Sequence, residues 1–108
     1  MRVITRSDIP LTYQAVQSAH ACVQFQYEHP ELAKNWFNNS NYLIFLSVEN
    51  EQELEKLISK ANSNNINISI FREPDINNEI TAIALEPCDW SRRHTSGIPL
   101  MRKEKVDV

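Results

Sequence analysis

The chain has 108 residues, 42% of them hydrophobic and 23% charged, a composition typical of one globular domain and not of a disordered chain. A formal net charge of −3 argues against a wholly basic nucleic-acid-binding surface, and the single glycine, Gly97, excludes glycine-rich phosphate loops. No apolar stretch approaches the roughly 20 residues of a membrane span, and MRVITR does not resemble a leader, so we expect a cytoplasmic protein. Cys22 and Cys88 have no metal-like spacing and are expected to be reduced thiols.

The first half of the chain predicts a strand followed by two helices. Residues 2–5 have the composition of a strand, and Pro10 suits the first turn of a helix because its missing N–H is not needed there. Helical periodicity runs over about residues 11–28, and Pro30 ends it. A second short helix is expected over 31–37. The side chains predicted to face the core from the long helix are Val16, Ala19, Val23 and Tyr27, with Ala15 and Cys22 beside them.

The second half predicts a buried strand, a capped helix and two further strands. Residues 42–48 are apolar almost throughout, as in a strand covered on both faces. Asn50 can cap the next helix, with Glu53 three positions later. The apolar stripe of this helix consists of Leu54, Leu57, Ile58 and Ala61. Residues 66–70 alternate in polarity, and residues 80–85 form a further strand.

Alternation of strands and helices predicts parallel pairing through crossover connections, and the short link between the last two strands predicts an antiparallel pair. We therefore predict an α/β fold: a single three-layer α/β/α domain over residues 1–108 with a mixed four-stranded sheet. Residues 88–108 are expected to form a basic tail, irregular or weakly helical. Its basic residues are Arg92, Arg93, Arg102, Lys103 and Lys105, five of the eleven in the chain.

One motif resembles a known family. Residues 17–21, Gln-Ser-Ala-His-Ala, are expected on the helix that follows a strand ending in Arg6-Ser7-Asp8. This arrangement resembles that of the type II peptidyl-tRNA hydrolases, and the chain resembles a divergent, bacterial-type member of this family. The later order of elements is also similar, including a last strand that starts with Thr81-Ala82, so the resemblance covers about residues 2–87.

The resemblance implies cleavage of the ester that joins a peptide to the 3′ ribose of tRNA. This chemistry needs an activated water, donors for the oxyanion and cations for phosphates. Gln17 and His20 match the helix motif, Glu73 stands at the family's acidic position after the third strand, and Thr81 matches a polar residue at the start of the fourth. Tyr13 occupies the position where the family has a lysine, and the family's flanking glycines are missing.

The same residues have structural interpretations that remain open. Tyr13, Gln17 and His20 lie at helical spacing and are expected on one face, where Gln17 would orient water or an ester carbonyl. His20 is either a catalytic group or, by the interpretation we favour, a histidine hydrogen-bonded into the core. Glu73 and Asp75 either share a site in which one carboxylate acts as a base, or form a solvated acidic turn.

Cationic candidates for contact with RNA are spread along the chain. Arg6 is expected to pair with Glu73 or with a phosphate, and Arg72 likewise. Arg92 and Arg93 either contact the tRNA backbone or are simply solvated, and Thr81 is either a site residue or an ordinary strand residue.

Three functions follow, in order of preference. The first is hydrolysis of peptidyl-tRNA or another acylated RNA, a carboxylic ester hydrolysis with tRNA as partner. The second is a non-catalytic module that binds RNA or protein in the same cleft, which the missing lysine and the negative charge favour. The third is an enzyme that acts on a different small ester or amide, with Glu73 or Asp75 as base. No metal, cofactor or membrane partner is expected, and a homodimer is left open.

Overall fold

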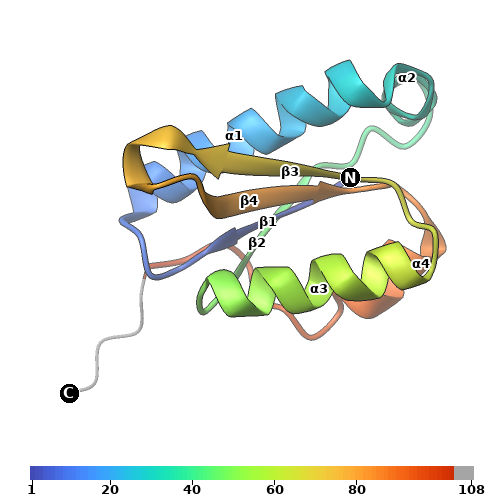
Figure 1. Ribbon diagram of the computed structural model, residues 1–108. Coiled ribbons are helices and arrows are strands. Elements are labelled where there is room, and N and C mark those ends of the chain that lie inside the picture. Colours follow the sequence, from blue (N-terminus) through green and yellow to red (C-terminus); the bar gives the residue numbers. More distant parts are fainter. Residues whose placement is uncertain (104–108) are drawn as a thin grey trace.

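The computed structural model describes residues 1–103 as a sheet between two layers of helices (Figure 1). In chain order the elements are β1 (Arg2–Arg6), α1 (Leu11–Glu28), α2 (Pro30–Asn38), β2 (Ile44–Val48), α3 (Glu51–Ser63), β3 (Ile68–Glu73), a 3₁₀ turn (Pro74–Ile76), β4 (Glu79–Leu85) and α4 (Asp89–His94). The predicted α/β class with a mixed four-stranded sheet is confirmed. Lys105, part of the predicted basic tail, lies outside the described residues.

The strands are arranged in the order β2-β1-β4-β3. β1 pairs with β2 in parallel, whereas β4 is antiparallel to both of its neighbours, β1 and β3. β1, β2 and β3 therefore run in the same direction, and their carboxyl ends meet at one edge of the sheet. We call this the carboxyl edge, and the start of β4 lies there too.

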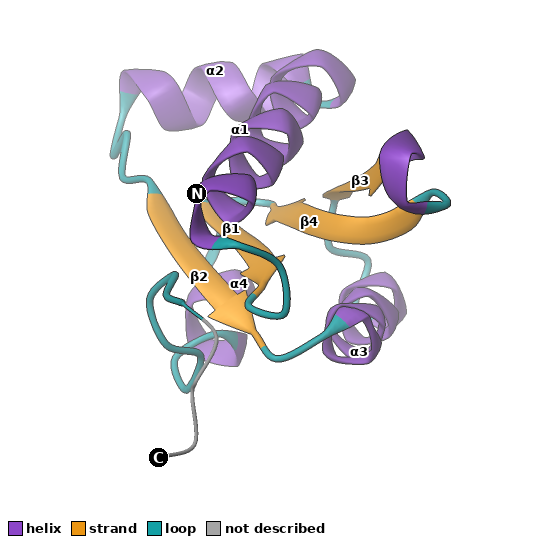
Figure 2. Ribbon diagram, turned by 90° about the vertical axis from the view of Figure 1, so that its left-hand side faces the viewer, coloured by secondary structure: helices purple, strands orange, loops and turns teal. Residues whose placement is uncertain are grey.

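Helices cover both faces of the sheet, with α1 and α2 on one side and α3 and α4 on the other (Figures 1 and 2). The core on the α1 side contains Met1, Val3, Ala21, Phe25, Ala33, Trp36, Ala82 and Ala84. The core on the α3 side contains Ile4, Leu46, Leu54, Leu57, Ala61, Ile80, Ile83 and Leu85. The connections that follow β1 and β2 lead to opposite faces, an arrangement that in open α/β sheets often marks a ligand site at the strand ends.

The buried face of α1 differs from the prediction. Of the predicted stripe, Val16, Ala19, Val23 and Tyr27 are exposed, while Ala15 and Cys22 are half-buried. The residues that α1 buries are Gln14, Gln17, Ser18, Ala21 and Phe25. Hydrogen bonds compensate much of this polar burial: the Gln14 Nε2 amide donates to the carbonyl oxygens of Ile9 (3.0 Å) and Arg102 (2.8 Å), although Gln14 Oε1 is buried without a partner among the described residues. Hydrogen bonding therefore overrides hydrophobic periodicity on this helix.

The predicted cap of α3 is present. The Asn50 side chain accepts a hydrogen bond from the Glu53 backbone N–H at 3.1 Å, and Leu54, Leu57 and Ala61 are buried below it. This cap fixes where the chain leaves β2 at the carboxyl edge.

Asparagines occupy the left-handed backbone positions of this glycine-poor chain. Asn41, Asn65, Asn77 and Asn78 have φ between 54° and 60°. Asparagine tolerates this conformation better than other non-glycine residues. Asn77 and Asn78 thereby close the connection from β3 to β4 at the carboxyl edge.

The segment after β4 is more regular than predicted. Residues 89–94 form α4, and Leu100 forms an antiparallel bridge with Leu46 of β2. Ser47 N–H donates to the Pro99 carbonyl (3.1 Å) and Met101 N–H to that of Phe45 (2.9 Å). The tail expected to be irregular or weakly helical thus holds a short helix and a strand-like segment along the free edge of β2.

Candidate functional site

The start of β4 is irregular at the position of Thr81. In the pairing with β3, Phe71 lies opposite Ala82, whereas Arg72 lies opposite Ile80. Thr81 is therefore the additional residue of a β-bulge. Because of this residue, Thr81 and the adjacent Ala82 both face α1, and the Thr81 hydroxyl reaches the helix.

Gln17 and Thr81 form a buried pair between α1 and β4. The Thr81 hydroxyl donates to Gln17 Oε1 at 2.6 Å, and the Thr81 carbonyl accepts from the Thr5 hydroxyl at 2.8 Å. Thr81 and Thr5 are fully buried, and Gln17 is 3% exposed. The pair joins α1 to β4, and Gln17 Oε1 already accepts the hydrogen bond from the Thr81 hydroxyl.

Arg6 is buried and connects the end of β1 to the start of β4. Its guanidinium donates to Asp8 through Nε (2.6 Å) and Nη2 (2.9 Å), and Nη1 donates to Glu79 (2.8 Å) and to the Ile80 carbonyl (3.2 Å). The hydrogen bond to Asp8, followed by that to Glu79, raises the pKa of Arg6 above its ordinary value. These contacts use four of the five N–H groups, so the predicted pairing of Arg6 with Glu73 is wrong.

Glu73 and Asp75 have different surroundings. Glu73, the last residue of β3, is half-buried, and its side chain has no hydrogen-bond or ionic partner among residues 1–103. Its cross-strand neighbour is Glu79, whose carboxylate is held by Arg6. Asp75 lies in the exposed 3₁₀ turn. Among the described residues, the Glu73 carboxylate therefore has no partner, whereas that of the neighbouring Glu79 is paired with Arg6.

Tyr13 and His20 lie on the solvent side of α1. The Tyr13 side chain is 49% exposed. His20 is also exposed, and its ring stacks on that of Phe71 with centroids 4.5 Å apart and planes 5° from parallel. The expectation of a histidine hydrogen-bonded into the core is wrong, because this ring packs on the edge strand β3 instead.

The predicted RNA-contacting arginines divide between the two ends of the sheet. Arg72 is exposed at the carboxyl edge and donates to the Asn78 carbonyl at 3.3 Å. Arg92 lies beside Arg2 at the opposite end, and both Arg92 and Arg93 pair with Asp89, whose pKa the hydrogen bond from Arg92 lowers.

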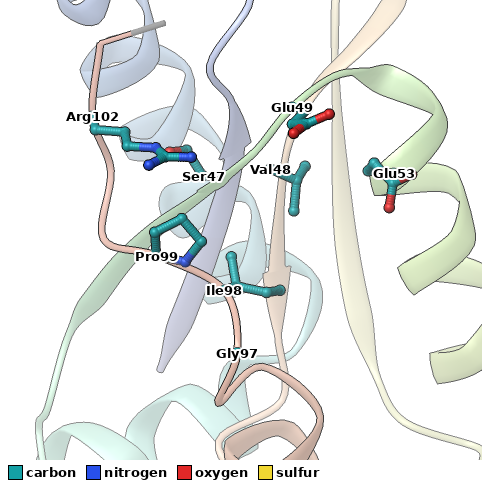
Figure 3. Close-up of a pocket in the computed structure, with 8 residues that line it drawn as sticks. All are labelled: Ser47, Val48, Glu49, Glu53, Gly97, Ile98, Pro99 and Arg102. Atoms are coloured by element: carbon teal, nitrogen blue, oxygen red, sulfur yellow. The ribbon is translucent and has the colours of Figure 1, made fainter. Parts of the chain in front are cut away.

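Two hollows lie at the carboxyl edge. The first, of about 380 Å³, lies between the end of β2 and the segment 97–102 (Figure 3). Arg102 lies on one side of it, with Glu49 and Glu53 on the other. The second hollow, of about 470 Å³, is lined by Asp8, Ile9, Pro10, Leu11 and Lys103. Each hollow therefore has one cationic side chain in its wall.

The described part of the chain was searched for clusters of metal-binding side chains and for membrane-spanning helices. Residues 1–103 contain no group of three or more His, Cys, Asp or Glu side chains that could hold a metal ion. No described helix is long and apolar enough to cross a bilayer.

Comparison with known proteins shows the family of the chain. The family of peptidyl-tRNA hydrolase PTH2 matches residues 1–95. The chain belongs to this family. It is also 30% identical over 95 residues to a peptidyl-tRNA hydrolase of Thermococcus onnurineus, a match that covers 79% of this chain and 80% of the relative.

The hydrogen bonds of the structure identify two residues that sequence reasoning missed. Glu79 neutralises Arg6, and Glu51 accepts a hydrogen bond from the Ile80 backbone N–H at 2.7 Å. The start of β4 is thus held from three other elements: from β1 by Arg6 and Thr5, from α1 by Gln17, and from α3 by Glu51. Placing Glu79 opposite Glu73 in the last hairpin would have found the first of these two residues.

Proposed function

We propose that this protein hydrolyses the ester of peptidyl-tRNA at the carboxyl edge of its sheet, with Glu73 as the general base. The observation that carries the proposal is the Glu73 carboxylate, half-buried at the end of β3 and unpaired within residues 1–103. A general base must present its carboxylate to the attacking water, and Arg6 engages the carboxylate of Glu79, whereas no described residue engages that of Glu73. Membership of the PTH2 family supports the substrate class.

The chemistry divides between the exposed and the buried residues of this edge. Glu73 takes a proton from water as the water oxygen bonds to the ester carbonyl carbon, and it then gives this proton to the 3′ oxygen of the ribose as the bond between that oxygen and the carbonyl carbon breaks. The exposed Tyr13 hydroxyl is the donor we assign to the carbonyl oxygen, in place of the family lysine. Gln17 and Thr81 act as positioning residues, because they hold α1 against β4 from a buried pair.

The cations that suit a tRNA end are Arg72, Arg102 and Lys103, all at the carboxyl edge. Arg92 and Arg93 are less suited to this role because both pair with Asp89 and lie at the other end of the sheet. Cytoplasmic location, a role in translation and the bacterial type stay predictions, and the relative from Thermococcus is archaeal.

The test is peptide release from a model peptidyl-tRNA by the full chain. We expect Glu73→Gln to lower kcat by roughly 10²-fold or more, the usual loss when a general base is removed. The matched control is Glu55→Gln, because Glu55 is an exposed carboxylate on α3, across the sheet from α1. Asp75→Asn should have little effect. KM should rise with salt because phosphate contacts are screened.

Three outcomes would overturn the proposal. The first is no turnover by the wild-type chain above a no-enzyme control at several pH values. The second is equal loss in Glu73→Gln and Glu55→Gln. The third is full activity in Glu73→Gln. Salt-sensitive RNA binding without turnover would instead support the non-catalytic binding module.

A further inference from the structure

The hydroxyl of Ser47 is buried beside the first hollow of the carboxyl edge and has no hydrogen-bond partner. Ser47 is 2% exposed, and its Oγ atom finds no partner within residues 1–103. It lines the hollow of about 380 Å³ between the end of β2 and the segment 97–102, which we call the Ser47 hollow (Figure 3). Buried hydroxyls are nearly always hydrogen-bonded, so one that borders a hollow points to a ligand.

The Ser47 hollow has opposite charges on its two sides. Figure 3 shows the guanidinium of Arg102 on the side of Ser47, with Glu49 and Glu53 across the hollow. Neither Arg102 nor Glu49 forms an ion pair with another described residue. The carboxylate of Glu53 is paired with Lys56 at 2.9 Å. The hollow therefore offers a cation and a hydroxyl at one end and a carboxylate at the other.

The wall that carries Arg102 is held in place by hydrogen bonds of its backbone. The Pro99 carbonyl accepts from the Ser47 N–H at 3.1 Å, and the Arg102 carbonyl accepts from the buried Gln14 amide at 2.8 Å. These bonds attach the segment to β2 at one point and to α1 at another. A ligand that enters the hollow therefore has little backbone to order, which lowers the entropic cost of binding.

We propose that the Ser47 hollow binds a free α-amino acid with an aliphatic side chain. The ligand carboxylate accepts hydrogen bonds from the guanidinium of Arg102, whose fork of N–H groups suits a carboxylate, and from the Ser47 hydroxyl. The ligand ammonium group donates to the carboxylate of Glu49. The aliphatic side chain packs on the apolar part of the wall, which consists of Val48, Ile98 and Pro99.

The size of the hollow agrees with a ligand of this class. Sites for small molecules have volumes from about 300 Å³ upward, and a sphere of about 380 Å³ is roughly 9 Å across. Two hydrogen bonds of about 2.9 Å, with roughly 3 Å between the charged groups of an α-amino acid, give a similar span. One amino acid can therefore contact both charged sides at once.

Charge favours an amino acid over a nucleotide in this hollow. A phosphate bound to Arg102 would bring a negative charge toward Glu49 and Glu53 without a cation to offset it, and like charges at this range repel. An amino acid carries its own ammonium group to that side. The net charge of the ligand and the two ends of the hollow are then matched.

The Ser47 hollow is separate from the place of attack proposed for Glu73. β2 and β3 are the two outer strands, so three strand spacings of about 4.8 Å place their ends roughly 14 Å apart. Amino-acid binding goes beyond the proposed function and does not rest on it. It does engage Arg102, one of the three cations assigned to the tRNA end, so a bound amino acid leaves less positive charge there for RNA.

An NMR titration of the full chain with leucine tests the proposal. Gly97 is the single glycine of the chain and lines the hollow, so its amide signal is readily recognised. We expect the amide signals of Ser47 and Gly97 to move and to saturate with a Kd of about 1 mM, as for a small ligand at an open site. Two analogues of leucine, 4-methylpentanoate without the ammonium group and 3-methylbutylamine without the carboxylate, should bind at least about tenfold more weakly.

Variants assign the contacts. Arg102→Met and Glu49→Gln should each raise the Kd for leucine at least about tenfold, and Ser47→Ala by about threefold to tenfold. The matched controls are Lys103→Met and Glu55→Gln, which remove the same charges outside the hollow and should leave the Kd unchanged. Ser47→Ala should be as stable to urea as the wild type, because it removes a buried hydroxyl that has no partner among the described residues.

Four outcomes would overturn the proposal. The signals of Ser47 and Gly97 stay in place up to about 50 mM leucine, well above the expected Kd. Leucine and its two analogues bind alike. Lys103→Met weakens binding as much as Arg102→Met does. Adenosine 5′-monophosphate, used as a probe for a nucleotide, moves the same signals at lower concentration than leucine, which would make the hollow a nucleotide site.

Discussion

Removal of the Thr81 hydroxyl should separate a structural role of the Gln17–Thr81 pair from a direct catalytic one. Thr81→Val keeps the shape of the side chain but leaves Gln17 Oε1 without its donor at 2.6 Å. Both residues are buried, so water does not readily replace the lost hydrogen bond. We expect the free energy of unfolding to fall by about 1–3 kcal/mol, the usual cost of an unsatisfied buried polar group.

Removing both partners should cost less than the sum of the single changes. In Gln17→Leu/Thr81→Val neither polar group is left unpaired, so we expect a coupling energy of about 1–2 kcal/mol. Urea unfolding followed by circular dichroism measures each corner of this cycle. Thr12→Val is the matched control, because Thr12 is exposed on the same helix and its change should stay within about 0.5 kcal/mol.

The reasoning would be refuted by additive effects within about 0.5 kcal/mol, or by a Thr81→Val variant as stable as the wild type. If Gln17 acted directly on substrate, peptide release by Thr81→Val would fall without loss of stability. If the pair only holds α1 against β4, activity should follow the folded fraction.

Three further predictions concern other parts of the fold. Arg6→Met should lower the free energy of unfolding by about 2–4 kcal/mol, because it leaves the carboxylates of Asp8 and Glu79 without their cation. The control Arg72→Met should lower it by less than about 0.5 kcal/mol, and urea unfolding of both variants measures the difference. Asn50→Ala should cost about 1 kcal/mol through loss of the α3 cap, and Asn50→Gly clearly less. Burial raises the pKa of the Cys22 thiol, so the thiol should alkylate more slowly in the folded chain than in the urea-unfolded chain. The free energy of unfolding should fall as the pH rises above the pKa of the unfolded thiol, because the unfolded chain then loses the thiol proton while the folded chain keeps it. Equal alkylation rates in the folded and unfolded chains would contradict the expectation for Cys22.

Much of the fold could be predicted because local signals determine it. Pro10 and Pro30 bracket α1, and Asn50 with Glu53 marks the start of α3. The orientation of α1 could not be predicted in this way. Gln14 is buried because a carbonyl about ninety residues away, that of Arg102, accepts its hydrogen bond. Periodicity cannot indicate a partner so distant in sequence.

The place of Glu73 in the sheet could be predicted from the sequence, but the ionic partner of Arg6 could not. The carboxyl edge follows from strand order, and Glu73 was expected at the end of its strand. The partner of Arg6 depends on which strand lies next to β1, and in the sheet β4 lies between β1 and β3. Glu79, rather than Glu73, therefore neutralises Arg6.

The pairing of the segment around Leu100 with β2 has a consequence for solubility. An uncovered outer strand offers its free N–H and C=O groups to other chains and so promotes aggregation. The backbone bonds of Pro99 and Met101 occupy such groups on Ser47 and Phe45. This short segment therefore protects the sheet from edge-to-edge association, and its removal would expose β2 as a template for other chains.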